Sequence, residues 1–176
     1  MNKIRPSTLA WLLAGLICLT MGLPTARAQL QLKNPTVGDV TFGFFGDNRE
    51  AQRLHREDVI AKENYCPTSG CVLRLEGVEV RPSGARSGQT MVLSTTYTIL
   101  TPDNLAIPVT ITREIFFRDK SLGTTKSTEY SKINGTWTQE VDFTLPANAA
   151  PGVYTLKTKV TTGFDSVHKE AQFQVE

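Results

Sequence analysis

Apolar and polar residues alternate in short segments from Val72 to the end of the chain, and Gly, Pro, Asn and Asp separate these segments. Successive side chains of a strand point to opposite faces of a sheet, so a period of two predicts half-buried strands. The clearest segment spans 136–145. Its apolar phase consists of Trp137, Val141, Phe143 and Leu145, opposite threonines and carboxylates.

Seven segments carry this pattern. They are Val72–Arg81, Thr90–Leu100, Ile107–Arg118, Ser121–Ser131, Thr136–Leu145, Val153–Thr162 and Val167–Val175. The count and spacing predict an all-β protein, an immunoglobulin-like antiparallel β-sandwich of about seven strands. The polar segment Ser121–Ser131 is expected to be a short edge strand.

Two local features refine this prediction. In the first strand, Leu73 and Leu75 precede Gly77 and Val78 and Val80 follow it, so the inward phase changes at the Glu76-Gly77 step. A β-bulge there would keep both apolar pairs facing the core. Asn134-Gly135 has the composition of a tight hairpin turn.

The region before the sandwich has a different pattern. Leu30–Leu32 and Val37–Phe45 have an extended character, and the polar stretch Asn48–Glu63 follows. Asp47 and Glu50 have the spacing of a helix capping box. We expect a short exposed helix or a structured loop in this polar stretch.

The N-terminus has the order of a secretory signal peptide. Lys3 and Arg5 precede an apolar run from Leu9 to Leu23, and the small-residue sequence Ala26-Arg27-Ala28 ends it. The run is shorter than the roughly 20 apolar residues of a membrane span. We expect cleavage near Ala28 and a periplasmic or secreted protein; a retained membrane anchor is the alternative.

Cleavage would divide the chain into a signal peptide (1–28), an N-terminal extension with a disulfide loop (29–71) and an Ig-like sandwich (72–176). The 148 remaining residues of the 176 suit one domain. Without Lys3, Arg5 and Arg27, 16 basic residues face 17 acidic ones. This balance gives no indication of nucleic-acid or anionic-lipid binding.

Cys66 and Cys71 are the two cysteines of the predicted mature chain. An even pair in an oxidising compartment predicts a disulfide. Closing so short a loop would stabilise the fold by roughly 2 kcal/mol. A redox function is the alternative, although redox pairs usually have two residues between the cysteines.

The stretch from Leu145 to Leu156 contains Pro151-Gly152 immediately before Val153-Tyr154. It resembles the corner before the penultimate strand of bacterial Ig-like extracellular domains, including the CARDB (cell adhesion) group, over about 72–176. The resemblance implies a structural corner in which the ring of Tyr154 enters the core and its hydroxyl bonds to nearby backbone. It also implies a protein that binds, spaces or assembles.

No constellation of residues has the pattern of a catalytic, cofactor or metal site. The two histidines, His55 and His168, are expected at the surface, without a nucleophile motif beside them. A zinc site from His55, Cys66 and Cys71 is a weaker alternative to the disulfide. We therefore expect no catalytic residues, no cofactor and no metal.

Four phenylalanines form a candidate contact surface. Phe42, Phe44 and Phe45 cluster among glycines, and Phe116 falls on the outward phase of its strand. Exposed aromatic residues that gather in one patch mark contact surfaces. The alternative is that the N-terminal three fold back over one end of the sandwich or add a strand.

These observations predict a non-catalytic exported interaction module, an accessory or adhesion-type component of a bacterial envelope assembly. Its expected partner is another envelope or extracellular protein, without nucleic acid. One alternative is a structural subunit or chaperone of a surface fibre, in which the segment 29–45 pairs with a neighbour's sheet edge. A periplasmic enzyme or thiol-redox protein is a further alternative.

Overall fold

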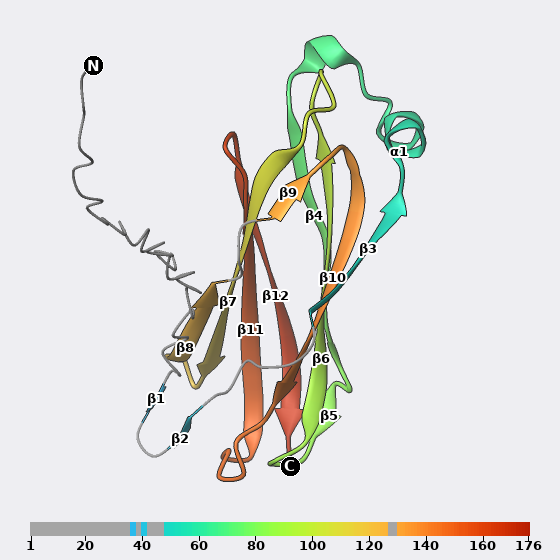
Figure 1. The fold of residues 1–176 in the computed structure, drawn as a ribbon. Coiled ribbons are helices and arrows are strands. Elements are labelled where there is room, and N and C mark those ends of the chain that lie inside the picture. The colour runs from blue at the N-terminus through green and yellow to red at the C-terminus, as the bar shows by residue number, and fades with distance from the viewer. Residues whose placement is uncertain (1–35, 38–39, 42–47, 127–129) are drawn as a thin grey trace, which may run out of the picture. The chain divides into compact units, whose positions relative to one another are not determined.

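The computed structural model describes residues 36–37, 40–41, 48–126 and 130–176. Residues 48–126 and 130–176 form an immunoglobulin-like β-sandwich of two sheets, as the alternation of apolar and polar residues predicted (Figure 1). Each sheet buries one face against the other, because the apolar phase of every long strand points inward.

One sheet has four antiparallel strands in the order β3-β10-β6-β4. Their bounds are Asn48–Leu54 for β3, Gly135–Thr144 for β10, Thr90–Leu100 for β6 and Val72–Arg81 for β4. The predicted bulge is confirmed, because the register of β4 against β6 shifts between Leu75 and Gly77. Glu76 is therefore the extra residue.

The other sheet has six strands in the order β5-β12-β11-β7-β8, with β9 pairing separately with β7. Their bounds are Gly84–Ala85 for β5, Ser166–Val175 for β12, Gly152–Thr161 for β11, Ile107–Phe117 for β7, Lys120–Lys126 for β8 and Tyr130–Lys132 for β9. The short β5 runs parallel to β12, and the other pairings are antiparallel. After β4, the chain thus crosses from the first sheet to the second.

The Asn134-Gly135 hairpin prediction is wrong. β9 pairs with β7 and β10 pairs with β6, so this dipeptide joins the two sheets. Asn134 is 1% exposed, and its side chain accepts from the backbone N–H and hydroxyl of Thr101 and donates to the Thr101 carbonyl. This dipeptide therefore forms the connection between the two sheets and not a hairpin turn within one sheet.

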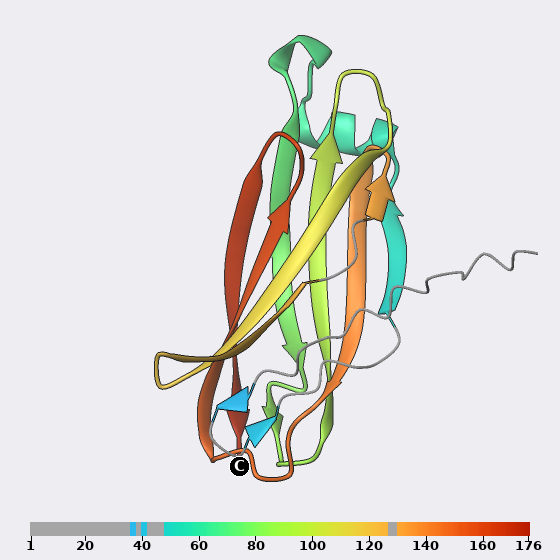
Figure 2. The ribbon, with the colours of Figure 1, turned by 60° about the vertical axis from the view of Figure 1, so that its left-hand side comes forward.

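The polar stretch 48–63 contains a strand as well as a helix. β3 lies along β10 at the edge of the four-stranded sheet (Figure 2), and α1 (Arg56–Glu63) follows it. The capping-box prediction is wrong, because Glu50 lies within β3 and α1 begins after His55 without a side-chain cap. Val59 anchors the helix with no exposed surface.

The described part of the N-terminal extension also includes β1 (Thr36–Val37) and β2 (Val40–Thr41), which pair with each other. A 3₁₀ turn, η1 (Pro67–Ser69), joins α1 to β4. Within 48–126 and 130–176, no helix has the length and apolar character that crossing a bilayer requires.

The sandwich interior consists of two apolar clusters. One contains Met91, Leu93, Ile115, Phe143, Tyr154, Leu156 and Phe173 among its members. The other contains Leu73, Leu75, Tyr97, Ile99, Val109, Ile111 and Val160. Four buried polar side chains lie on the inward phase of the same strands, between the residues of these clusters: Thr95, Arg113, Gln139 and Thr158. We call these four residues the polar layer.

Candidate functional site

A groove lies on the outer face of the six-stranded sheet and measures about 560 Å³. Residues of β7, β11 and β12, with the turn after β7, line it: Phe116, Arg118, Asp119, Val153, Thr155, Lys157, Glu170 and Gln172. Because side chains alternate along each strand, these are the outward positions opposite the core residues.

Strand register places the groove residues in rows across the sheet. Thr155 pairs with Phe116 on one side and with Gln172 on the other. Lys157 likewise lies between Glu114 and Glu170. One row therefore carries an aromatic ring and an amide on either side of a threonine, and the next row carries a cation between two carboxylates.

The apolar side chains of the groove are accessible to solvent. Phe116 is half-buried, and Val153 is 52% exposed. Arg118 and Asp119 form the turn between β7 and β8 with positive φ angles of 49° and 62°. The guanidinium of Arg118 lies 5.0 Å from the ring centre of Phe117, which holds the arginine at this end of the groove.

The charged groups of the groove are not paired with one another. Within the residues that the structure describes, the side chains of Asp119, Lys157 and Glu170 take part in no ion pair or hydrogen bond. The groove therefore presents both signs of charge to solvent.

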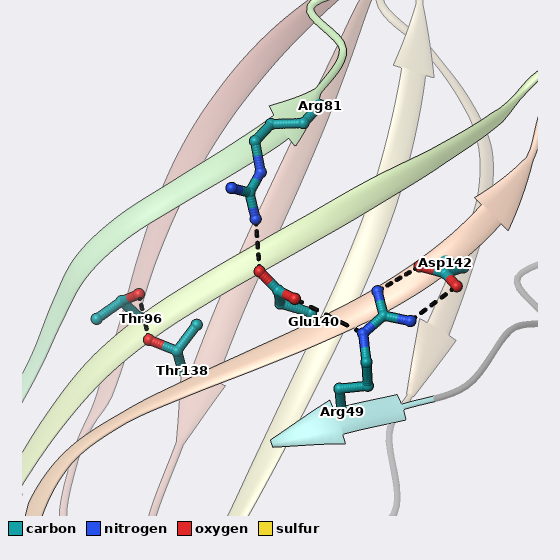
Figure 3. A network of polar contacts seen from close by, with 6 residues as sticks. All are labelled: Arg49, Arg81, Thr96, Thr138, Glu140 and Asp142. Carbon is teal, nitrogen blue, oxygen red and sulfur yellow. Dashed lines mark hydrogen bonds and ion pairs between the residues drawn. The ribbon is translucent and has the colours of Figure 1, made fainter. Parts of the chain in front are cut away.

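The outer face of the four-stranded sheet is different, as Figure 3 shows. Arg49 on β3 donates to both carboxylate oxygens of Asp142, at 2.9 and 2.6 Å, and lies 3.6 Å from Glu140. Arg81 donates to the other oxygen of Glu140 at 2.5 Å. The hydrogen bond from Arg49 lowers the pKa of Asp142 and, in return, raises that of Arg49. Arg49, Arg81, Glu140 and Asp142 are thus paired with one another on this face.

Threonine hydroxyls on this face also pair across strands. Thr96 and Thr138 are 2.9 Å apart between their oxygens, and Thr98 and Thr136 are 2.8 Å apart. Thr98 also donates to Glu76, the bulge residue, at 2.9 Å. Little hydrogen-bonding capacity is left on these hydroxyls for a partner.

Among the predicted site residues, Phe116 lies in the groove on the outward phase of β7. Phe42, Phe44 and Phe45 lie outside the described residues. A single contact surface made of all four phenylalanines therefore stays a prediction.

Tyr154 has the geometry of a tyrosine corner. Its ring is 2% exposed and stacks between Phe117 and Phe173, at centroid distances of 4.5 and 5.3 Å. Its hydroxyl donates to the carbonyl of Ala150 at 2.8 Å. Burial raises the pKa of the phenol. This residue is a structural anchor under the β11 end of the groove.

The predicted disulfide is not formed in this structure. Cys66 and Cys71 are free and exposed, and Cys66 Sγ lies 3.1 Å from Thr68 Oγ1, which lowers the pKa of the Cys66 thiol. Hydrogen bonds close the loop instead. Tyr65 donates to the Gly70 carbonyl at 2.7 Å, and the Ser69 N–H donates to the Cys66 carbonyl at 2.8 Å.

Neither histidine lines the groove. His55 precedes α1, and His168 lies on β12 opposite Lys159. Within the described ranges, no three His, Cys, Asp or Glu side chains gather closely enough to hold a metal ion.

Comparisons with known proteins give no family. No protein-family model matches the chain, and no curated protein matches it. Among solved structures, the C-terminal domain of wzt is 13% identical over 76% of this chain and 81% of that chain, with a TM-score of 0.46.

Two other solved structures match shorter parts of the chain. The alkylpurine DNA glycosylase AlkC of Pseudomonas fluorescens, bound to DNA containing an abasic site analog, is 13% identical with a TM-score of 0.45. A family 123 glycoside hydrolase of Clostridium perfringens is 12% identical with a TM-score of 0.41. Both matches cover 59% of this chain, which spans only 30% and 27% of those chains. At these TM-scores the likenesses carry no argument about function.

Proposed function

We propose that this protein is an exported, non-catalytic interaction module that binds another envelope or extracellular protein in the groove of the six-stranded sheet. The carrying observation is the unpaired charge of the groove beside an accessible aromatic ring. Lys157, Glu170 and Asp119 surround Phe116 and Val153 without pairing among themselves. Protein interfaces are enriched in aromatic residues at their core and have a polar, solvent-accessible rim.

The partner is expected to match this chemistry. An apolar side chain would cover Phe116 and Val153, and an acidic and a basic residue would meet Lys157 and Glu170 respectively. The groove carries about as many positive as negative side chains. We therefore expect it to select a partner by the order of charged residues along the partner's surface more than by the partner's net charge.

The signal-peptide pattern of residues 1–28 supports the export part of the proposal. N-terminal sequencing of the protein recovered from outside the cytoplasm is expected to begin at Gln29. A protein recovered there with Met1 intact would contradict the cleavage.

Capture of partners from the native envelope and medium tests the binding part. The wild-type protein and the variant Phe116→Ala are compared, with Phe164→Ala as a matched control. Phe164 is 38% exposed in the turn between β11 and β12 and does not line the groove. A partner held by the wild type and the control should be lost with Phe116→Ala, and its Kd should rise at least tenfold, about 1.4 kcal/mol.

Circular dichroism of each variant separates lost binding from lost folding. A partner that binds the folded Phe116→Ala variant as tightly as the wild type would contradict the groove as the contact surface. Turnover of a substrate by the purified protein would contradict the non-catalytic assignment.

A further inference from the structure

The polar layer lies inside the sandwich at one level of both sheets. Gln139 pairs with Thr95 in the four-stranded sheet, and Arg113 pairs with Thr158 in the six-stranded sheet. The guanidinium of Arg113 crosses between the sheets, donating from Nη2 to Thr95 Oγ1 at 3.1 Å and to Gln139 Oε1 at 2.7 Å. These two bonds, with the strand register of Thr158 beside Arg113, place the four side chains at one level of the interior.

Three polar atoms of this layer have no hydrogen-bond partner among the described residues: Arg113 Nε, Gln139 Nε2 and Thr158 Oγ1. The three residues are 3%, 0% and 0% exposed, so bulk water does not reach them. The Gln139 side-chain oxygen already accepts a hydrogen bond from Arg113. The amide nitrogen of Gln139 is therefore a donor that needs an acceptor of its own. Two N–H donors and one hydroxyl are thus buried without a protein acceptor, a situation that folded proteins rarely leave unresolved.

The charge of the layer is also unbalanced. Glu50 pairs with Gln139 across β3 and β10 and is the carboxylate of that row. Its oxygens already meet the Tyr97 hydroxyl at 3.0 Å and the Lys132 ammonium at 2.5 Å. Burial lowers the pKa of Arg113 to about 10, which leaves it charged at neutral pH. Arg113, Lys132 and Glu50 together therefore carry one excess positive charge.

We infer that the polar layer binds one small monovalent anion of halide size. This anion accepts hydrogen bonds from Arg113 Nε, from Gln139 Nε2 and from the Thr158 hydroxyl. An anion satisfies all three groups, because each of them can donate. It also compensates the buried guanidinium, whereas a water molecule in the same place would leave that charge unpaired.

Thermal unfolding in chloride and in gluconate at equal ionic strength tests this inference, since gluconate is too large for the site. An anion that binds only the folded state raises Tm with its concentration. We expect the wild-type protein to unfold roughly 4 °C higher in chloride than in gluconate. Equal Tm values in the two salts would mean that only water occupies the layer and would overturn the inference.

Variants assign the effect to the layer. Arg113→Met removes the charge at similar length, and Thr158→Val removes the hydroxyl at nearly unchanged shape. We expect Arg113→Met to abolish the chloride response, which is the difference in Tm between chloride and gluconate, and Thr158→Val to reduce it. If Arg113→Met does not fold, Thr158→Val still tests the inference. The matched control Lys157→Met removes a cation of the outer face and should keep the full response. A response that survives in both layer variants would contradict the site.

Crystals grown in bromide give a direct readout. We expect an anomalous peak beside Arg113 Nε and Gln139 Nε2. Density there without an anomalous signal would contradict anion binding.

Discussion

The two outer faces of the sandwich are built from the same alternation of residues and differ in how their polar groups are used. On the four-stranded sheet, Arg49 and Arg81 are bonded to Asp142 and Glu140, and threonine hydroxyls pair across strands. On the six-stranded sheet, Lys157 lies between two carboxylates on neighbouring strands without an ion pair among the described residues.

This difference indicates which face contributes more to stability, and under the proposed function it leaves the other face available to a partner. Paired groups on a β-sheet contribute to folding through each cross-strand contact. Unpaired groups beside an open groove contribute little to folding and can meet a partner without first breaking internal bonds. Substitutions on the first face should therefore change unfolding more than those on the second.

The largest effect is expected where the paired face begins. Gly135 has φ +151°, and a Cβ there would lie 2.7 Å from the Leu54 carbonyl oxygen of β3. Gly135→Ala should reduce the free energy of unfolding by about 3 kcal/mol, because backbone atoms cannot move aside cheaply. Urea unfolding measures this loss.

Gly77→Ala is the matched control for Gly135→Ala. A Cβ at Gly77, in β4 of the same sheet, would meet nothing within 4 Å. Its effect should stay within about 0.5 kcal/mol. Equal losses from both variants would show that contact with β3 is not the cause.

A threonine comparison tests the two faces directly. Thr98 is fully buried and bonds to Thr136 and Glu76, whereas Thr155 lies in the groove. Thr98→Val should cost about 2 kcal/mol, since it leaves buried polar atoms without a partner. Thr155→Val should change the free energy of unfolding by no more than about 0.5 kcal/mol. Similar losses from the two variants in urea would remove the distinction between the faces.

A charge reversal in the groove should have a smaller effect on stability. Lys157→Glu would place three carboxylates in one row, with Glu114 and Glu170 as neighbours. We expect a loss of about 1 kcal/mol at low salt that shrinks as salt screens the repulsion. A loss that does not change between low and high salt would contradict this electrostatic origin.

The smallest effect is an acid dependence of the paired face. The bond from Arg49 holds the pKa of Asp142 below its ordinary value, so the folded state binds this proton less readily than the unfolded state. The resulting stability is present above about pH 4 and is lost as pH falls through the folded pKa. In Asp142→Asn this part of the acid dependence should be absent, as unfolding curves between about pH 5 and pH 2 would show. An unchanged pH profile would mean that the exposed pair contributes nothing measurable.

The sequence predicted the strands well where one phase was apolar. β4 and β6 begin and end at the predicted residues, and the Glu76-Gly77 step is a bulge, because the apolar phase itself shifts there. β3 was missed, because an edge strand buries little and Ala51 and Leu54 are its only apolar residues. The hairpin prediction at Asn134-Gly135 was wrong for a different reason. Its composition is that of a hairpin turn, but a long-range pairing decides which sheet the next strand joins.

The site was predicted only in part. The alternation of apolar and polar residues predicted that Phe116 points outward. The groove could not be predicted in this way, because it depends on which strands are neighbours in the sheet. The polar layer can be recognised in the sequence pattern. One polar residue interrupts the inward apolar phase in each of four strands: Thr95 between Leu93 and Tyr97, Arg113 between Ile111 and Ile115, Gln139 between Trp137 and Val141, and Thr158 between Leu156 and Val160. The strand register brings these four interruptions to one level, which the sequence alone does not reveal.

The buried Asn134 has a consequence for producing this protein. Asn134-Gly135-Thr136 is a glycosylation sequon. In the folded protein both ends of the Asn134 amide are bonded to Thr101, and the residue is almost fully buried. A eukaryotic secretory host could attach a glycan only before this crossing between the sheets closes, and the glycan would then prevent it from closing. Fold and glycan exclude each other at this position, so a bacterial host is the appropriate source of the folded protein.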